Sequence, residues 1–251
     1  MSPSCVLHKL AQHDSSSPLK DKLFRMKKIL IAKISLFVLV IYSLCSCQDK
    51  YYEDGGLANP NYNGNMLQYL EQNKAFDTEA KIVKLAGLEK ELTQDELTFF
   101  APSDRSVRYA MDNVNFYLEA TGKDTISIDE ISPDIWRKTL MYYMYKGTNR
   151  LKDYYQLDIT LKSVYPGQFY TSYNGTLVNI GVNYADVNGI KYAGYRSILF
   201  SFIPDYNSPD IWYSTPVVSH DIKPSNGVIH ALSLNHTFGQ LNFLDAVLAS
   251  R

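Results

Sequence analysis

Apolar residues recur at helical spacing in the first half of the folded region and at alternate positions in the second half. Residues 66–70 and 82–86 predict two short amphipathic helices, the second of which ends at Gly87. The apolar run at 97–100, Leu-Thr-Phe-Phe, predicts a compact buried strand. The fold is therefore expected to begin with small helices that lead into a core strand.

Two longer helices are predicted after this strand. Pro102 turns the chain, and Ser103 or Asp104 is placed to cap a helix that has its apolar residues on one face. The Ser-Pro-Asp sequence at 132–134 is a strong helix start. Apolar residues at helical spacing carry this second helix to a stop at Gly147.

Beyond Gly147 the pattern changes to alternation, interrupted by Gly, Pro and Asn, which predicts antiparallel strands. These strands are expected at 169–173, 176–182, 198–203 and 228–234. Asn226 and Gly227 supply the φ > 0 positions of a tight hairpin ahead of the last strand. Helices first and strands afterwards predict an α+β domain, with N-terminal helices packed on an antiparallel, strand-rich wedge.

The N-terminal segment has the features of a secretion and lipid-attachment signal. Met26 opens a basic stretch that is followed by an apolar run at 34–44, too short to span a bilayer. Its end, Leu44-Cys45-Ser46-Cys47, resembles the bacterial lipobox, in which a Leu three residues ahead and a small residue just ahead of a Cys direct lipid transfer to that Cys. We expect translation to begin at Met26, cleavage after residue 46, and attachment to the membrane through a lipid on Cys47.

This interpretation divides the chain into four parts. They are an upstream extension (1–25), a lipoprotein signal peptide (26–46), a flexible tether rich in Gly, Asn and Pro (47–65) and a single domain (66–251). The expected location is the bacterial cell envelope, at the outer membrane. All three cysteines precede the domain, so no disulfide or zinc framework is expected in it.

Composition and charge disfavour nucleic acid as a partner. With 45% hydrophobic and 20% charged residues, the chain has the balance of a globular protein. Residues 1–46 hold seven basic and two acidic residues, so the totals of 25 and 26 become 18 and 24 in the mature chain, a net charge near −6. Such a mildly acidic protein has no field that would hold phosphates.

Two sequence blocks resemble the signatures of the fasciclin-type domain. The first, at 97–104, reads Leu-Thr-Phe-Phe-Ala-Pro-Ser-Asp, and the second, at 221–230, reads Asp-Ile-Lys-Pro-Ser-Asn-Gly-Val-Ile-His. A weaker match lies at 141–147, where the family usually has a Tyr-His pair ahead of a Gly and this chain has two tyrosines. The resemblance covers about residues 66–240 and implies a fasciclin-like fold.

The resemblance also implies a non-enzymatic extracellular adhesion or interaction module. In the animal members of the family, integrin contact is attributed to the Asp-Ile of the second block and to the Tyr-His region. The corresponding residues here are Asp221, Ile222, Tyr142 and Tyr143, and Tyr143 departs from the family pattern. A turn or strand-end carboxylate is at least as good an interpretation of Asp221.

The segment 192–213 is dense in aromatic residues and is expected to hold the excess length of this chain over the family. Phe200 and Phe202 alternate as a buried strand face. The other candidates flank turn residues and form either a flat platform for a glycan or a protein partner or part of the core: Tyr206, Trp212 and Tyr213.

No motif of a nucleophilic, metal-dependent or nucleotide-dependent enzyme occurs in the sequence, and no cofactor is expected. His230 is interpreted as a core histidine. A hairpin would bring His220 close to it, but two nitrogens are too few to predict a metal site. The predicted function is a non-enzymatic envelope lipoprotein that acts as an adhesion or protein-interaction module. The alternative is a glycan-binding accessory lipoprotein of a polysaccharide-uptake system, so the expected partner is an extracellular protein or a glycan.

Overall fold

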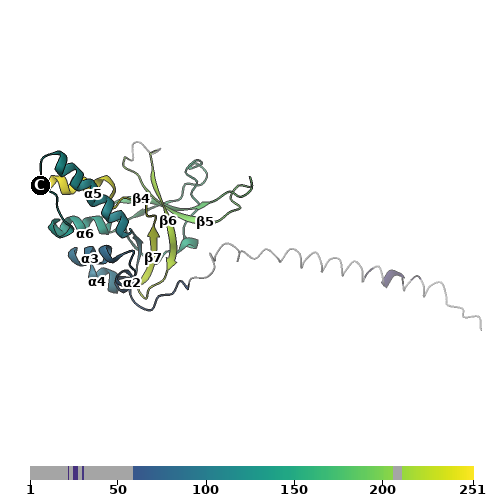
Figure 1. The fold of residues 1–251 in the computed structure, drawn as a ribbon. Coiled ribbons are helices and arrows are strands. Elements are labelled where there is room, and N and C mark those ends of the chain that lie inside the picture. The colour runs from purple at the N-terminus through teal and green to yellow at the C-terminus, as the bar shows by residue number, and fades with distance from the viewer. Residues whose placement is uncertain (1–21, 23–24, 28–29, 31–58, 206–210) are drawn as a thin grey trace, which may run out of the picture. The chain divides into compact units, whose positions relative to one another are not determined.

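The computed structural model describes residues 22, 25–27, 30, 59–205 and 211–251. The chain divides into two compact units, Met1–Gly55 and Gly56–Arg251, and the second contains the fold (Figure 1). Cys47 and Tyr206 lie outside the described residues, so the lipid attachment and one member of the aromatic platform stay predictions. Within the described residues, no helix has both the length and the apolar character that crossing a bilayer requires.

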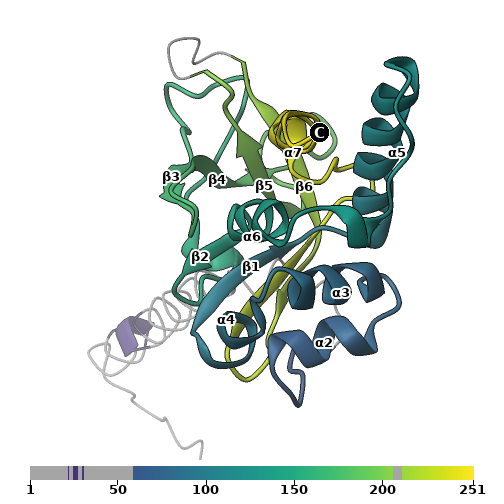
Figure 2. The ribbon, with the colours of Figure 1, turned by 90° about the vertical axis from the view of Figure 1, so that its left-hand side faces the viewer.

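The helices of this second unit lie on one side of a sheet (Figures 1 and 2). They are α2 (Met66–Gln72), α3 (Asp77–Leu85), α4 (Glu89–Gln94), α5 (Asp104–Ala120), α6 (Pro133–Met141) and α7 (Gln240–Ala249). Helix α6 lies between α3 and α7 and contacts both (Figure 2). Helices from the N-terminal and the C-terminal part of the domain therefore belong to the same layer.

Among the described residues, seven strands form one sheet in the order β2-β1-β7-β6-β5-β4-β3. The strands are β1 (Leu97–Ala101), β2 (Met144–Lys146), β3 (Gln168–Thr171), β4 (Leu177–Tyr184), β5 (Arg196–Phe202), β6 (Tyr213–Ile222) and β7 (Gly227–Leu232). Just after β3, the Tyr173 amide donates to the Met144 carbonyl of β2 at 2.9 Å. The two edges of the sheet thus approach each other and give the expected strand-rich wedge.

The α+β architecture is confirmed, but the sheet is mixed rather than antiparallel throughout. Strands β1 and β7 run parallel, with Phe99 opposite Ile229. The Phe100 side chain on β1 reaches across the sheet, and its ring centroid lies 4.9 Å from that of Phe200 and 5.0 Å from that of His230. The two sequence blocks that resemble the fasciclin signatures are therefore neighbours in one core.

The helix predicted to run to Gly147 is shorter than expected. It ends at Met141, and residues 144–146 form β2, with Met144 opposite Phe99. Pairing with β1 provides backbone hydrogen bonds that override the helical spacing of the apolar residues. The sequence pattern also did not predict α4, β6 and α7.

Asn226 and Gly227, at the start of β7, have a different role from the predicted tight hairpin turn. The Asn226 side chain accepts a hydrogen bond from the Met66 amide at 2.9 Å and donates to the carbonyls of Leu92 and Asp95. Gly227 has φ +150°, and a Cβ there would collide with the Leu97 carbonyl. The pair therefore locks α2 and α4 against the sheet, and Asn226 is not a left-handed residue of the hairpin.

The last residues of the predicted tether contact the domain. The Tyr62 amide donates to the Lys223 carbonyl at 2.9 Å, and the Lys223 amide donates to the Pro60 carbonyl at 2.7 Å. The Ser225 amide donates to the Gly64 carbonyl at 2.8 Å. The folded unit thus begins before Met66, because this segment satisfies backbone groups of the connection between β6 and β7.

Candidate functional site

Side chains of the second sequence block, residues 221–230, fix the position of the loop that follows β2. The Asp221 carboxylate accepts a hydrogen bond from the Leu151 amide at 2.7 Å. The His230 Nε2–H donates to the Asn149 carbonyl at 3.0 Å, and the Thr98 hydroxyl accepts from the Asn149 amide at 2.9 Å. Side chains from β1, β6 and β7 therefore converge on one loop, which gives these motif residues a structural role.

Burial keeps His230 neutral at this loop, whereas polar neighbours keep Asp221 ionised. His230 is fully buried, which lowers its pKa to about 4 and keeps the ring neutral, so that Nδ1 accepts from the Asp221 amide at 3.3 Å. Partial burial acts to raise the pKa of Asp221, but the nearby His220 ring and the hydrogen bond from the Leu151 amide hold it below its usual value. Asp221 therefore stays ionised, and its carboxylate already accepts a hydrogen bond from within the domain.

The contact role predicted for Asp221 and Ile222 stays a prediction. Arg150 Nε lies 3.4 Å from Asp221 Oδ2, and the Asp221 side chain is only 15% exposed. Ile222 is partly buried against the core and pairs with Ile229. His220 lies 3.7 Å from the same carboxylate. Across the described residues, no three His, Cys, Asp or Glu side chains are grouped to hold a metal ion.

Tyr143, predicted to contact a partner, is instead completely buried. Its hydroxyl accepts a hydrogen bond from the Gly239 amide at 2.7 Å and pairs with His236 Nε2 at 2.7 Å. Burial raises the pKa of Tyr143 and lowers that of His236 to about 3, so both are neutral and Tyr143 donates to His236. No partner can reach this side chain, because the C-terminal segment covers it. Tyr142 is 5% exposed.

The first sequence block caps two helices rather than one. Pro102 is buried at the end of β1, and the Ser103 hydroxyl accepts from the Ser106 amide at the start of α5. The Asp104 carboxylate instead accepts from the amides of Thr78 and Glu79, at 2.8 and 3.2 Å, in the first turn of α3. The block thus ties α3 to α5.

Phe200 and Phe202 are buried as predicted, but Trp212 and Tyr213 do not share a platform. Tyr213 lies opposite Phe202 and lines a small hollow beside α5 and α7. Trp212 contacts Phe169 on β3, with ring centroids 6.4 Å apart. Tyr213 thus lies near α5 and α7, whereas Trp212 lies against the edge strand β3, so the two rings have different surroundings.

Exposed apolar side chains gather on the loop before β3 and on β3 itself, and together with the half-buried Trp212 beside them we call them the outer patch. It consists of Ile159, Leu161, Val164, Phe169 and Trp212. The Lys162 ammonium lies 4.5 Å from the centroid of the Trp212 ring, which places the loop that holds these residues next to β6. The Tyr192 hydroxyl donates to the Asp158 carboxylate at 3.0 Å and ties the loop to the connection between β4 and β5.

Comparison with known proteins identifies the domain. The family model of the Fasciclin domain matches residues 74–233, which is more than half of the chain. The chain belongs to the fasciclin family. Fasciclin domains form an adhesion-related family and are generally non-enzymatic modules. No curated protein matches the chain.

A solved structure resembles this fasciclin domain. It is a FAS1 domain pair from the insect cell adhesion molecule Fasciclin I, with 15% sequence identity and a TM-score of 0.42. The alignment covers 67% of this chain and 49% of that chain, so this chain spans about half of its length.

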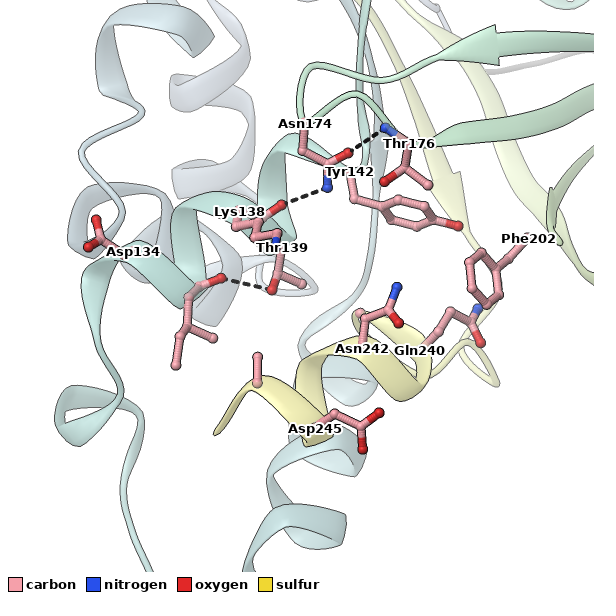
Figure 3. Close-up of a pocket in the computed structure, with 13 residues that line it drawn as sticks. Asp134, Lys138, Thr139, Tyr142, Asn174, Thr176, Phe202, Gln240, Asn242 and Asp245 are labelled. Atoms are coloured by element: carbon pink, nitrogen blue, oxygen red, sulfur yellow. Dashed lines mark hydrogen bonds between the residues drawn. The ribbon is translucent and has the colours of Figure 1, made fainter. Parts of the chain in front are cut away.

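The fasciclin domain also contains a pocket that sequence reasoning missed (Figure 3). It has a volume of about 590 Å³ and lies between α6, α7, the turn before β4 and the end of β5. Tyr142 and Phe202 line it, with ring centroids 6.2 Å apart at 83°. Since α7 was not predicted, no sequence signal could bring these residues together.

Proposed function

We propose that this protein is a non-enzymatic lipoprotein of the cell envelope that acts as a protein-interaction module. The membership of the fasciclin family supports an adhesion-related role. The N-terminal sequence up to Cys47 supports lipid attachment at the outer membrane. The outer patch carries the proposal, because exposed apolar side chains that gather on one loop and the adjoining strand are typical of interaction sites.

The proposed partner is a protein, and its contact surface is the outer patch. Val164 is 56% exposed and Phe169 is 49% exposed, so both leave apolar area in water that a partner would cover. Trp212 is held between Phe169 and Lys162. Binding to a surface whose side chains are already held costs little conformational entropy, and a central Trp is a common binding hot spot.

The test places a photo-crosslinking amino acid at position 164 in cells and identifies the protein that it captures. The captured protein is then purified, and its affinity for variants is measured. Phe169→Glu should weaken this binding by about 2 kcal/mol, a loss typical of a hot spot. Tyr117→Glu is the control, because Tyr117 is 47% exposed on α5, and it should bind normally. Equal affinity of the two variants would contradict the proposed surface.

A further inference from the structure

We infer that the pocket between α6 and α7 is a binding site for a neutral saccharide. Its volume of about 590 Å³ falls within the range of small-ligand sites, about 300–1,000 Å³. The pocket shares no residue with the outer patch, so this inference does not depend on the proposed protein interaction.

The walls of the pocket are fixed before any ligand binds. The Asn174 side chain, in the turn before β4, donates to the Lys138 carbonyl of α6 at 3.0 Å and accepts from the Thr176 amide at 3.0 Å (Figure 3). On the opposite wall, Gly239 at the start of α7 lies so close to Thr139 that a Cβ would collide with it. A pocket built on such contacts needs little reorganisation.

The polar groups of the pocket match the hydroxyl groups of a sugar. Asn242 projects from the first turns of α7 toward Tyr142 and Phe202 (Figure 3). Among the described residues, none makes a hydrogen bond to the side chains of Asn242 and Asp245, although both line the pocket. An amide that donates and accepts, beside a carboxylate that accepts, can satisfy neighbouring hydroxyls, which also do both.

Two aromatic side chains that line the pocket supply the apolar contact that sugar recognition also requires. Tyr142 and Phe202 are each less than 10% exposed, so they present small areas of aromatic carbon rather than open ring faces. The C–H groups of a pyranose can pack against such a surface while its hydroxyls bond to the polar groups. A purely apolar ligand would leave those polar groups without partners.

The charge of the lining selects neutral over acidic sugars. Asp134 and Asp245 contribute two carboxylates, and Lys138 contributes one ammonium group. This excess of negative charge repels uronates, sulfated sugars and phosphates. The ligand class that fits donors, acceptors, aromatic carbon and this charge is therefore a neutral oligosaccharide.

The experiment titrates the purified protein with neutral tetrasaccharides, namely cellotetraose, maltotetraose, mannotetraose and chitotetraose, and with tetragalacturonate. Binding is measured by calorimetry and by NMR chemical shifts. At least one neutral sugar should bind, and tetragalacturonate should bind more weakly. Asn242→Ala should weaken the binding at least about tenfold. Ala246→Phe should abolish it by filling the pocket without removing a polar group.

Two variants serve as controls for this experiment. Asn113→Ala changes the neighbouring hollow beside α5 and should leave the affinity unchanged. Phe169→Glu should also leave it unchanged, which separates this site from the proposed protein interaction. The inference is overturned if none of the four neutral sugars binds, if tetragalacturonate binds best, or if folded Asn242→Ala and Ala246→Phe bind as tightly as the parent protein.

Discussion

Glu79 in α3 is a single buried side chain that makes the free energy of unfolding depend on pH. It is 0% exposed, and among the described residues neither of its carboxyl oxygens has a hydrogen-bond partner. Burial, with a further contribution from Asp104, raises its pKa well above the usual value. The folded protein therefore binds this proton more tightly than the unfolded chain does.

The expected consequence is that the free energy of unfolding falls as the pH rises. The contribution of Glu79 is fully present below the unfolded pKa of about 4.3 and is lost as the pH climbs toward the raised folded value. Glu79→Gln carries no charge at any pH, so its free energy of unfolding should fall much less than that of the parent protein between about pH 4 and neutral pH. Chemical denaturation at several pH values measures this difference.

The control for Glu79→Gln is Glu96→Gln, because Glu96 is exposed on the loop before β1. It should leave the pH profile of stability unchanged. If Glu79→Gln keeps the pH slope of the parent protein, another group is responsible for that slope.

At the scale of elements, Asp104 connects two helices that the sequence alone treats separately. Helix α3 has Phe76 at its N-cap position and no side-chain cap of its own. The Asp104 carboxylate supplies that cap from the first turn of α5. A residue that sequence reasoning assigned to one helix start therefore serves another helix, because tertiary packing brings the two termini together.

Replacing Asp104 tests this cap. Asp104→Ala should lower the free energy of unfolding by about 0.5–2 kcal/mol, since it leaves two amides of α3 without an acceptor. Asp104→Asn keeps an oxygen acceptor and should recover most of the loss. Denaturant titration of both variants measures the effect. Equal destabilisation by Ala and Asn would show that the negative charge, and not the hydrogen bonds, stabilises this junction.

At the scale of the whole molecule, the proposal that a lipid is attached to Cys47 predicts where the domain acts. Cys47→Ala removes the thiol that would carry the lipid, so the protein should move from the detergent-extracted membrane fraction to the soluble fraction and keep its leader. Fractionation followed by mass spectrometry of the N-terminus measures both effects. A variant that still matures and remains on the membrane would contradict lipid attachment at this residue.

Much of the fold followed from local patterns. The strands at residues 97–100 and 228–234 and the start of α5 are where apolar alternation and capping residues predicted them. The prediction of a helix up to Gly147 was wrong, because residues 144–146 have helical spacing and become strand β2 only by pairing with β1. Local spacing cannot report a partner that lies more than forty residues away along the chain.

The site was less predictable than the fold. The Tyr143 hydroxyl was expected at a contact surface and lies under the C-terminal segment, where the Gly239 amide and His236 satisfy it. In the segment expected to form one aromatic platform, Tyr213 lines a hollow with α5 and α7, whereas Trp212 contacts Phe169 on β3. These outcomes depend on which elements cover which faces, and a one-dimensional pattern does not contain that information.

The sequence by itself determined the α+β class, the resemblance to the fasciclin family and the expected lipid-attachment residue, because these depend on residue type and spacing along the chain. Only the tertiary structure decided that Asp221 and His230 hold a loop, that Asp104 caps a distant helix, and that α7 completes a pocket with Phe202. Each of these features joins residues that are far apart in sequence. Their contacts exist only after the sheet orders its strands and the helices pack against it.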